Sequence, residues 1–145
     1  IKDNQISASS KWNSNQGARH GRLDAEPVSG GQRAAWCPGG ASKDQWIQID
    51  LLQPTKVTGI ITQGRNNNYY NQWVTTYKVE YGQDGNSFQS YDGGHIFSGN
   101  EDKNSKVKHI FKPSINARFI RVNPQTFHSG ICMRIELLCN SNQQK

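Results

Sequence analysis

Short segments with a two-residue hydrophobic period, separated by glycine-rich turns, constrain this chain more than any other feature. In residues 47–51, 77–81 and 133–137, apolar side chains alternate with polar or charged ones. This period places successive side chains on opposite faces of a β-strand. Residues 56–62 and 118–122 are denser apolar runs, as expected for strands covered on both faces. No long amphipathic helical pattern with caps is present, so the sequence predicts an all-β protein.

Turn residues indicate where these strands end, and the length limits how many domains they form. Gly-Gly, Pro-Gly and Asp-Gly pairs fall between the periodic segments, and residues 81–88 are typical of a β-hairpin. Many short strands joined by such turns predict a β-sandwich or a barrel. A chain of 145 residues allows one ordinary domain. We assign residues 1–139 to this domain and residues 140–145 to a polar C-terminal tail.

The charge balance favours anionic partners without selecting one. There are 17 Lys and Arg residues against 11 Asp and Glu, a net charge of +6. This charge suits sulfated glycans, phospholipid head groups or nucleic acid, and it equally serves solubility. Because no basic stripe or known nucleic-acid module is present, we expect no nucleic-acid partner. No transmembrane run or charged-then-apolar leader is present, so we expect any secretory signal to have been removed or never included.

Catalytic and metal-binding motifs are missing from the sequence. It has no G-x-S-x-G, P-loop or G-x-G-x-x-G segment, and its carboxylates are scattered. The four histidines lack metal-ligand spacing, and no pair of cysteines has the C-x2-C spacing of a zinc site. We therefore expect a binding protein rather than an enzyme, with no cofactor and no metal site.

Three loop regions, residues 9–21, 28–42 and 63–72, carry more aromatic and polar side chains than a simple connection needs. The third contains three successive asparagines and two tyrosines, a composition that resembles antibody paratopes. The candidate ligand contacts are Trp12, Asn13, Arg33, Trp36, Arg65, Asn67, Tyr69, Tyr70 and His128. The alternatives are that Trp12 packs over the rim of the sandwich, that Arg65 pairs with a carboxylate, and that the tyrosines are structural.

Several segments resemble, in order, the motifs of the discoidin domains, also called the coagulation factor V/VIII C-domain family. They are Ile6–Ser10, Gly21–Asp24, Trp46–Leu51, Thr62–Arg65, Trp73–Val79, Ala117–Arg121 and Met133–Leu137. Each match is short, but together they cover nearly the whole chain. The resemblance implies the galactose-binding-like discoidin fold, a jelly-roll-like β-sandwich of about eight strands with ligand-binding loops at one end.

The resemblance also assigns the three cysteines, for which free thiols in a cytosolic protein are otherwise the alternative. In the family's receptor tyrosine kinases, the cysteine of A-W-C-P pairs with that of C-M-R, which implies a disulfide between Cys37 and Cys132. The final cysteine of most members pairs with one that would precede residue 1. Cys139 has no such partner in the given sequence. Either the partner cysteine lies outside it, or Cys139 is free or joins a second chain or domain. A disulfide favours a secreted protein or an extracellular domain of a cell-surface protein.

Within the family, the pattern is most similar to the discoidin-domain receptors, and the segment around Trp73 is about as similar to slime-mould discoidin. The receptors have a collagen-contacting tryptophan where Trp12 stands and a trench arginine where Arg65 stands. This chain lacks the receptors' acidic residue before A-W-C-P and their glutamate after T-Q-G-R, and Gly130 replaces their trench asparagine. A collagen site built on an arginine–glutamate pair is therefore not expected here.

We expect an adhesion or recognition module whose ligand lies in a shallow trench framed by residues 10–16, 33–38, 65–71 and 128–132. The first partner class is a collagen-like extracellular-matrix protein or a cell-surface glycan, because aromatic rings supply area while Arg and Asn supply orientation. The alternative is an anionic phospholipid membrane, as in the family's blood-factor branch, or a sulfated polysaccharide. Charged residues of the strand motifs are assigned to structural ion pairs: Arg22, Asp24, Asp50, Arg121, Arg134 and Glu136.

Overall fold

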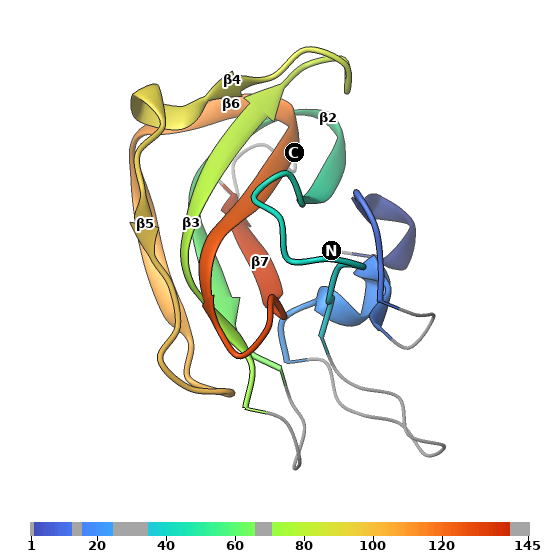
Figure 1. Ribbon diagram of the computed structural model, residues 1–145. Coiled ribbons are helices and arrows are strands. Elements are labelled where there is room, and N and C mark those ends of the chain that lie inside the picture. The colour runs from blue at the N-terminus through green and yellow to red at the C-terminus, as the bar shows by residue number, and fades with distance from the viewer. Residues whose placement is uncertain (1, 13–15, 25–34, 66–70, 140–145) are drawn as a thin grey trace.

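The computed structural model describes residues 2–12, 16–24, 35–65 and 71–139. Antiparallel strands dominate it, and its helical segments are short 3-10 helices (Figure 1). The strands are β1 (Ile6–Ala8), β2 (Ile47–Gln63), β3 (Trp73–Gly82), β4 (Gln89–Ser90), β5 (Phe97–Ser98), β6 (Val107–His128) and β7 (Arg134–Cys139). The 3-10 helices are η1 (Asp3–Gln5), η3 (Ala18–Gly21) and η4 (Tyr91–Gly93). The all-β prediction is confirmed.

Strands β2 and β6 are long because each crosses from one layer of the sandwich to the other. Residues 47–50 of β2 pair with the second half of β6, and residues 57–62 pair with its first half, with register shifts between the two parts. The first part is bordered by β1 on one side and, beyond β6, by β3. The second part is bordered by β7. The sheet therefore folds over on itself without closing, which confirms the predicted jelly-roll-like sandwich (Figure 1).

The bend in β2 explains why its sequence looks like two separate strands. Leu52 has a φ of 71°, and its backbone N–H donates a hydrogen bond to Asp50 Oδ1 at 2.8 Å. A positive φ is uncommon for leucine, and the aspartate bond supplies the local turn that holds it. The apolar alternation stops at this point, whereas the pairing with β6 resumes at Thr55.

The hydrophobic core lies between the two layers and uses the inward positions of the alternating segments. Its most buried side chains include Ile47, Ile49, Val57, Ile60, Val74, Val79, Ile120, Val122 and Ile135. The rings of Tyr77 and Phe97 stack with 5.4 Å between their centroids, and Tyr91 and Phe111 pack around Phe97. Burial raises the pKa of Tyr77 far above its ordinary value. The periodicity therefore identified the inward face correctly.

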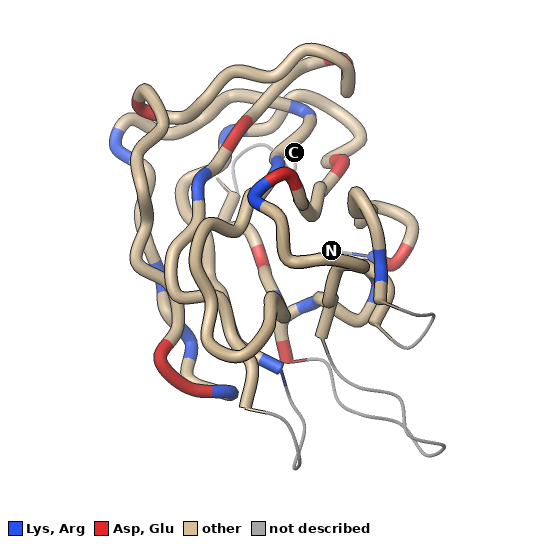
Figure 2. The backbone as a smooth tube through the Cα atoms, in the orientation of Figure 1, with Lys and Arg blue, Asp and Glu red and all other residues tan. Residues whose placement is uncertain are grey.

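Several charged residues of the strand motifs form ion pairs on the surface. Arg118 donates from Nε and Nη2 to the two carboxylate oxygens of Asp50, at 2.8 and 3.0 Å. The other pairs are Arg22 with Asp3, at 3.2 Å, and Asp24 with Lys106, at 2.9 Å. Figure 2 shows that the described charges are spread over strands and turns rather than gathered on one segment.

The ion pair predicted for Arg121 is wrong. Its guanidinium carbon lies 4.0 Å from the ring centroid of Trp46 and 3.9 Å from that of Phe88, and Nε donates to Gln48 Oε1 at 2.7 Å. No carboxylate among the described residues comes within ion-pair distance of it. The aromatic faces attract the cation instead, and burial lowers its pKa.

Candidate functional site

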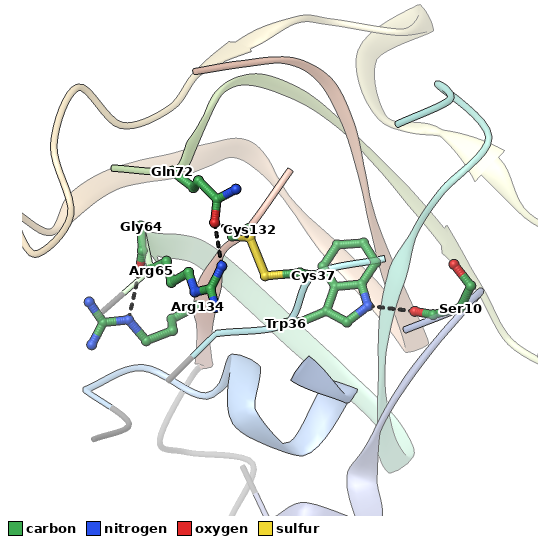
Figure 3. The surroundings of a disulfide bond; sticks show 8 residues. All are labelled: Ser10, Trp36, Cys37, Gly64, Arg65, Gln72, Cys132 and Arg134. Atoms are coloured by element: carbon green, nitrogen blue, oxygen red, sulfur yellow. Dashed lines mark hydrogen bonds between the residues drawn. A yellow bond between two sulfur atoms is a disulfide. The ribbon is translucent and has the colours of Figure 1, made fainter. Parts of the chain in front are cut away.

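The disulfide between Cys37 and Cys132 joins the second predicted loop to the segment before β7 (Figure 3). The two Cα atoms are 4.4 Å apart, although 95 positions separate the residues in sequence. Beside the disulfide, Trp36 and Met133 exchange two backbone hydrogen bonds of 3.0 Å. The disulfide implied by the family resemblance is confirmed. It fixes the end of the sandwich at which β2 ends and β3 and β7 begin, which we call the loop end.

Backbone hydrogen bonds attach the first predicted loop to the same disulfide. The N–H of Trp12 donates to the Cys37 carbonyl at 2.7 Å, and the N–H of Cys37 donates to the Gln16 carbonyl at 3.0 Å. Trp36 Nε1 donates to the Ser10 carbonyl at 2.8 Å (Figure 3). The backbone of Trp12 is therefore held in place, while 69% of the residue is exposed. A large aromatic side chain on a fixed backbone is preorganised for contact with a partner.

Gln72 connects the disulfide to the third predicted loop. Its backbone carbonyl accepts a hydrogen bond from the Arg65 N–H at 3.0 Å, and its Oε1 accepts a short one from Arg65 Nη1 (Figure 3). The same oxygen lies 3.5 Å from Cys132 Sγ, which is a van der Waals contact because a disulfide sulfur carries no proton. Arg65 is only 8% exposed. Its geometry is that of a positioning residue, which holds the chain after β2 against the start of β3.

Gly130 also packs against the side chain of Gln72. A Cβ atom at position 130 would lie 2.5 Å from Gln72 Nε2 and 3.0 Å from its Cδ. A larger residue here would require the Gln72 amide to shift. The glycine that departs from the receptor pattern is therefore part of the local packing at this end.

A buried cation supports the loop end from inside. Arg134 is 1% exposed, and its Nε donates to the Gly64 carbonyl at 2.7 Å (Figure 3). Its Nη2 donates to the Lys103 carbonyl at 2.9 Å and to Asn104 Oδ1 at 2.8 Å. These bonds hold residues 100–105 against the end of β2. Arg134 therefore binds backbone and amide oxygens, a role that the sequence pattern did not predict.

The structure divides the nine predicted ligand contacts into three groups. Trp12 and His128 are exposed at the loop end, and Arg65 is nearby but almost buried. The assignment of Trp36 is wrong, because its side chain is fully buried in the core and its ring N–H is already bonded. The remaining residues lie outside the described part of the chain: Asn13, Arg33, Asn67, Tyr69 and Tyr70.

Two side chains that the sequence did not select add to the surface at this end. The ring of Trp73 stacks on His128, with 4.4 Å between the centroids and 8° between the planes. Phe127, the next-to-last residue of β6, is 39% exposed. Trp73 belongs to one of the family's strand motifs, and its contact with His128 follows only from the β3–β6 register.

Acidification is expected to weaken the hydrogen bonds of Asp102 in residues 100–105 and the ion pair between Asp50 and Arg118. The pKa of Asp102 lies below the ordinary value of 3.8 because the hydroxyl and N–H of Ser105 donate to it, and Arg118 lowers the pKa of Asp50 in the same way. A lowered folded pKa adds stability above the ordinary value, and this stability is lost as the pH falls through the folded value. We expect a lower urea midpoint at about pH 3 than at about pH 7, and a smaller difference in Asp102→Asn. Equal differences in the two proteins would contradict the role of Asp102.

Two further observations concern the described ranges alone. In them, no group of three or more His, Cys, Asp and Glu side chains is placed to hold a metal ion. Among the same residues, no helix has both the length and the apolar character needed to cross a membrane. The described loop end offers a partner aromatic surface and hydrogen-bonding groups on a backbone tied by a disulfide.

Comparison with known proteins identifies the class. Residues 5–137 match the family model of the F5/8 type C domain, and the chain belongs to this family. Discoidin II of Dictyostelium discoideum has the same fold, with a TM-score of 0.85 and 30% identity over 92% of this chain and 54% of that one. Domains of this family are binding modules for carbohydrate or lipid and are typically non-catalytic.

Particular relatives are found among blood-clotting and secreted proteins. The venom prothrombin activator pseutarin-C non-catalytic subunit of Pseudonaja textilis is 39% identical over 94% of this chain and 10% of its own length. Lactadherin of Bos taurus is 42% identical over 82% of this chain and 28% of its own length. The chain therefore spans between about a tenth and about a quarter of these two relatives.

Proposed function

We propose that this chain is an extracellular recognition module that binds a cell-surface or matrix glycan at the loop end. The observation that carries the proposal is Trp12, whose side chain is exposed while its backbone is bonded to Cys37. An exposed aromatic ring on a fixed backbone can stack on a sugar, and neighbouring polar groups can orient the hydroxyls. The stacked pair of Trp73 and His128 adds a second aromatic surface at this end.

An extracellular location is part of the proposal. The bond between Cys37 and Cys132 supports it, because disulfides persist in oxidising compartments. Cys139 is a free thiol and partly buried, and burial together with Glu136 raises its pKa. A raised pKa makes the thiol less reactive at neutral pH. Pairing of Cys139 with a cysteine outside the given sequence or in a second chain stays a prediction, with a free thiol as the alternative.

An anionic phospholipid surface is the second candidate ligand. It is favoured by the exposure of Phe127 together with Trp12 at the loop end, and by the basic Lys11 beside Trp12. Exposed apolar side chains next to basic groups are typical of proteins that bind at membrane interfaces. The similarity to coagulation factor V of Pseudonaja textilis, 39% identical over 94% of this chain, points to the blood-factor branch and also supports this candidate.

The replacement Trp12→Ala is expected to abolish most ligand binding while leaving stability nearly unchanged. The side chain is largely exposed, and surface substitutions usually change the free energy of unfolding by no more than about 0.5 kcal/mol. Binding of both proteins is measured on a glycan array, on collagen-like peptides and on vesicles with and without anionic lipid. Glycan binding that is lost in the variant supports the proposal, and salt-sensitive binding to anionic vesicles alone supports the second candidate.

The matched control is Ile96→Ala. Ile96 is also an exposed apolar residue, at 47%, but it lies between η4 and β5 rather than at the loop end. Its replacement is expected to leave binding unchanged on every surface. If Trp12→Ala binds as tightly as the unmodified chain, Trp12 is not the contact and the proposed site is wrong.

A further inference from the structure

Three apolar side chains form a contiguous patch on the outer face of the layer that contains β7. The register places Leu138, Gly59 and Ile110 in one row across β7, β2 and β6, with Ile61 in the next row. Ile110 is 49% exposed, and Ile61 and Leu138 are partly exposed. A Cβ on Gly59 would lie 3.1 Å from Leu138 Cδ1 and 3.2 Å from Ile110 Cδ1, so these two side chains close over the glycine. We call Ile61, Ile110 and Leu138 the outer patch.

Opposite charges stand on the two sides of this patch. Glu136 on β7 and Lys108 on β6 are the direct neighbours of Ile61 in the sheet register. Directly opposite residues of antiparallel strands project from the same face. From β7 through β2 to β6, this row therefore contains an acidic, an apolar and a basic side chain. Lys108 is exposed, and no described carboxylate lies within ion-pair distance of it.

We propose that a second copy of this chain packs face to face on the outer patch, about a twofold axis parallel to β2. This axis exchanges the β7 side with the β6 side. Glu136 of each copy then meets the partner's Lys108, Leu138 meets the partner's Ile110, and the two Ile61 side chains face each other. A twofold interface must be self-complementary, and this row of charges has that property.

The charges favour a twofold axis parallel to β2 over one that runs across the strands in the plane of the interface. A twofold axis across the strands, through the row of Ile61, would set Glu136 against the partner's Glu136 and Lys108 against the partner's Lys108. Like charges brought together in this way are repulsive. With the axis along β2, the facing strands run nearly parallel, which is the aligned packing that sheets adopt face to face at a spacing of about 10 Å.

The arrangement has a consequence for binding. Rotation about an axis parallel to β2 preserves the direction of that strand, and the loop end lies where β2 ends. Both loop ends of the pair therefore point the same way. Two sites that face one surface bind it with an avidity above that of either site alone. The inference goes beyond the proposed function, since it holds whatever ligand the loop end takes.

Sedimentation velocity over a concentration series tests the pairing without any ligand. All proteins carry Cys139→Ser, so that no disulfide formed by this thiol contributes. We expect a reversible monomer–dimer equilibrium by about 1 mM chain, the regime of a weak interface. Lys108→Glu and Glu136→Lys are each expected to remain monomeric over the whole series, because each places like charges together twice in the dimer. A 1:1 mixture of the two variants is expected to dimerise, because the mixed dimer has opposite charges at both contacts, one pair with its original sign and one with reversed sign.

Controls separate this interface from a general effect of charge or of folding. Lys78→Glu makes the same change in net charge as Lys108→Glu, but it lies on β3 in the other layer, paired with Asn123. It is expected to leave the association unchanged. Ile110→Asp tests the apolar centre and is expected to abolish the association, with near-ultraviolet circular dichroism confirming the fold of each variant. A parent protein with Cys139→Ser alone that is strictly monomeric, or a mixture of the charge variants that stays monomeric while both are folded, would overturn the proposal. Neither result would affect the proposed ligand site, which shares no residue with the outer patch.

Discussion

Replacing Cys37 and Cys132 together by alanine is expected to lower the free energy of unfolding by about 4 kcal/mol, close to the upper end for a single disulfide. The bond closes a long loop, since 95 positions separate the two cysteines, and long loops lose the most entropy when they are cross-linked in the unfolded chain. Both residues are buried, at 5% and 2% exposure, so the folded state also loses close packing when the sulfurs are removed.

Chemical denaturation by urea, followed through tryptophan fluorescence, measures this loss. The matched control is Cys139→Ser, which removes the free thiol and is expected to shift the midpoint little. The double alanine variant is also expected to exchange the amide protons of Trp12 and Arg65 faster, because their bonds depend on the chain at Cys37 and Gln72. A variant as stable as the unmodified chain would show that the disulfide does not hold the loop end.

Replacing Arg134 by leucine is expected to lower the free energy of unfolding by about 3–5 kcal/mol. The guanidinium is fully buried and donates to the Gly64 carbonyl, the Lys103 carbonyl and Asn104 Oδ1. Leucine fills part of the volume but leaves these acceptors without their donor. Relief of the desolvated charge offsets only part of this cost.

Arg118→Leu is the matched control for this replacement. Arg118 pairs with Asp50 at the surface, where 40% of its side chain is exposed, so its loss is expected to shift the urea midpoint far less. Hydrogen exchange distinguishes a local from a global effect, because residues 100–105 should lose protection first in Arg134→Leu. Equal shifts for the two arginine variants would show that burial of Arg134 does not matter to stability.

The two predictions concern one assembly of four segments that are distant in sequence. Trp12 is bonded to Cys37, Cys37 to Cys132, Cys132 contacts Gln72, and Gln72 is bonded to Arg65. The exposed ring of Trp12 therefore projects from a backbone that the disulfide and these hydrogen bonds hold in place. Preorganisation of this kind reduces the entropy that a ligand must overcome on binding.

Sequence patterns predicted the fold well, because the inward face of each strand carries apolar side chains and the outward face carries mostly polar ones. The alternation in residues 47–51 and 77–81 gave the inward side chains correctly, and the Asp84-Gly85 turn lies between β3 and β4, where Tyr81 pairs with Gln89. The same patterns could not show that the two segments on either side of Leu52 belong to one bent strand. That depends on long-range pairing with β6, which leaves no local signal.

The candidate site was harder to predict, because exposure depends on what covers a residue. Trp36 and Trp12 both stand in polar, loop-like sequence, yet Trp36 is fully buried and Trp12 is mostly exposed. Arg65 and Arg134 both lie in family motifs, and in both the guanidinium is nearly hidden in the fold. The residues that cover these side chains are distant in sequence, so the local sequence did not indicate their burial.

By itself, the sequence determined the strand class and, through its motifs, the family, whose resemblance implied the disulfide. These properties follow from local periodicity and from short matching segments. Only the tertiary structure decided which tryptophan faces solvent, that Arg134 supports the loop end, and that Glu136, Ile61 and Lys108 share one row. Each of these depends on strands meeting across long separations in sequence, and burial and charge complementarity arise only once they have met.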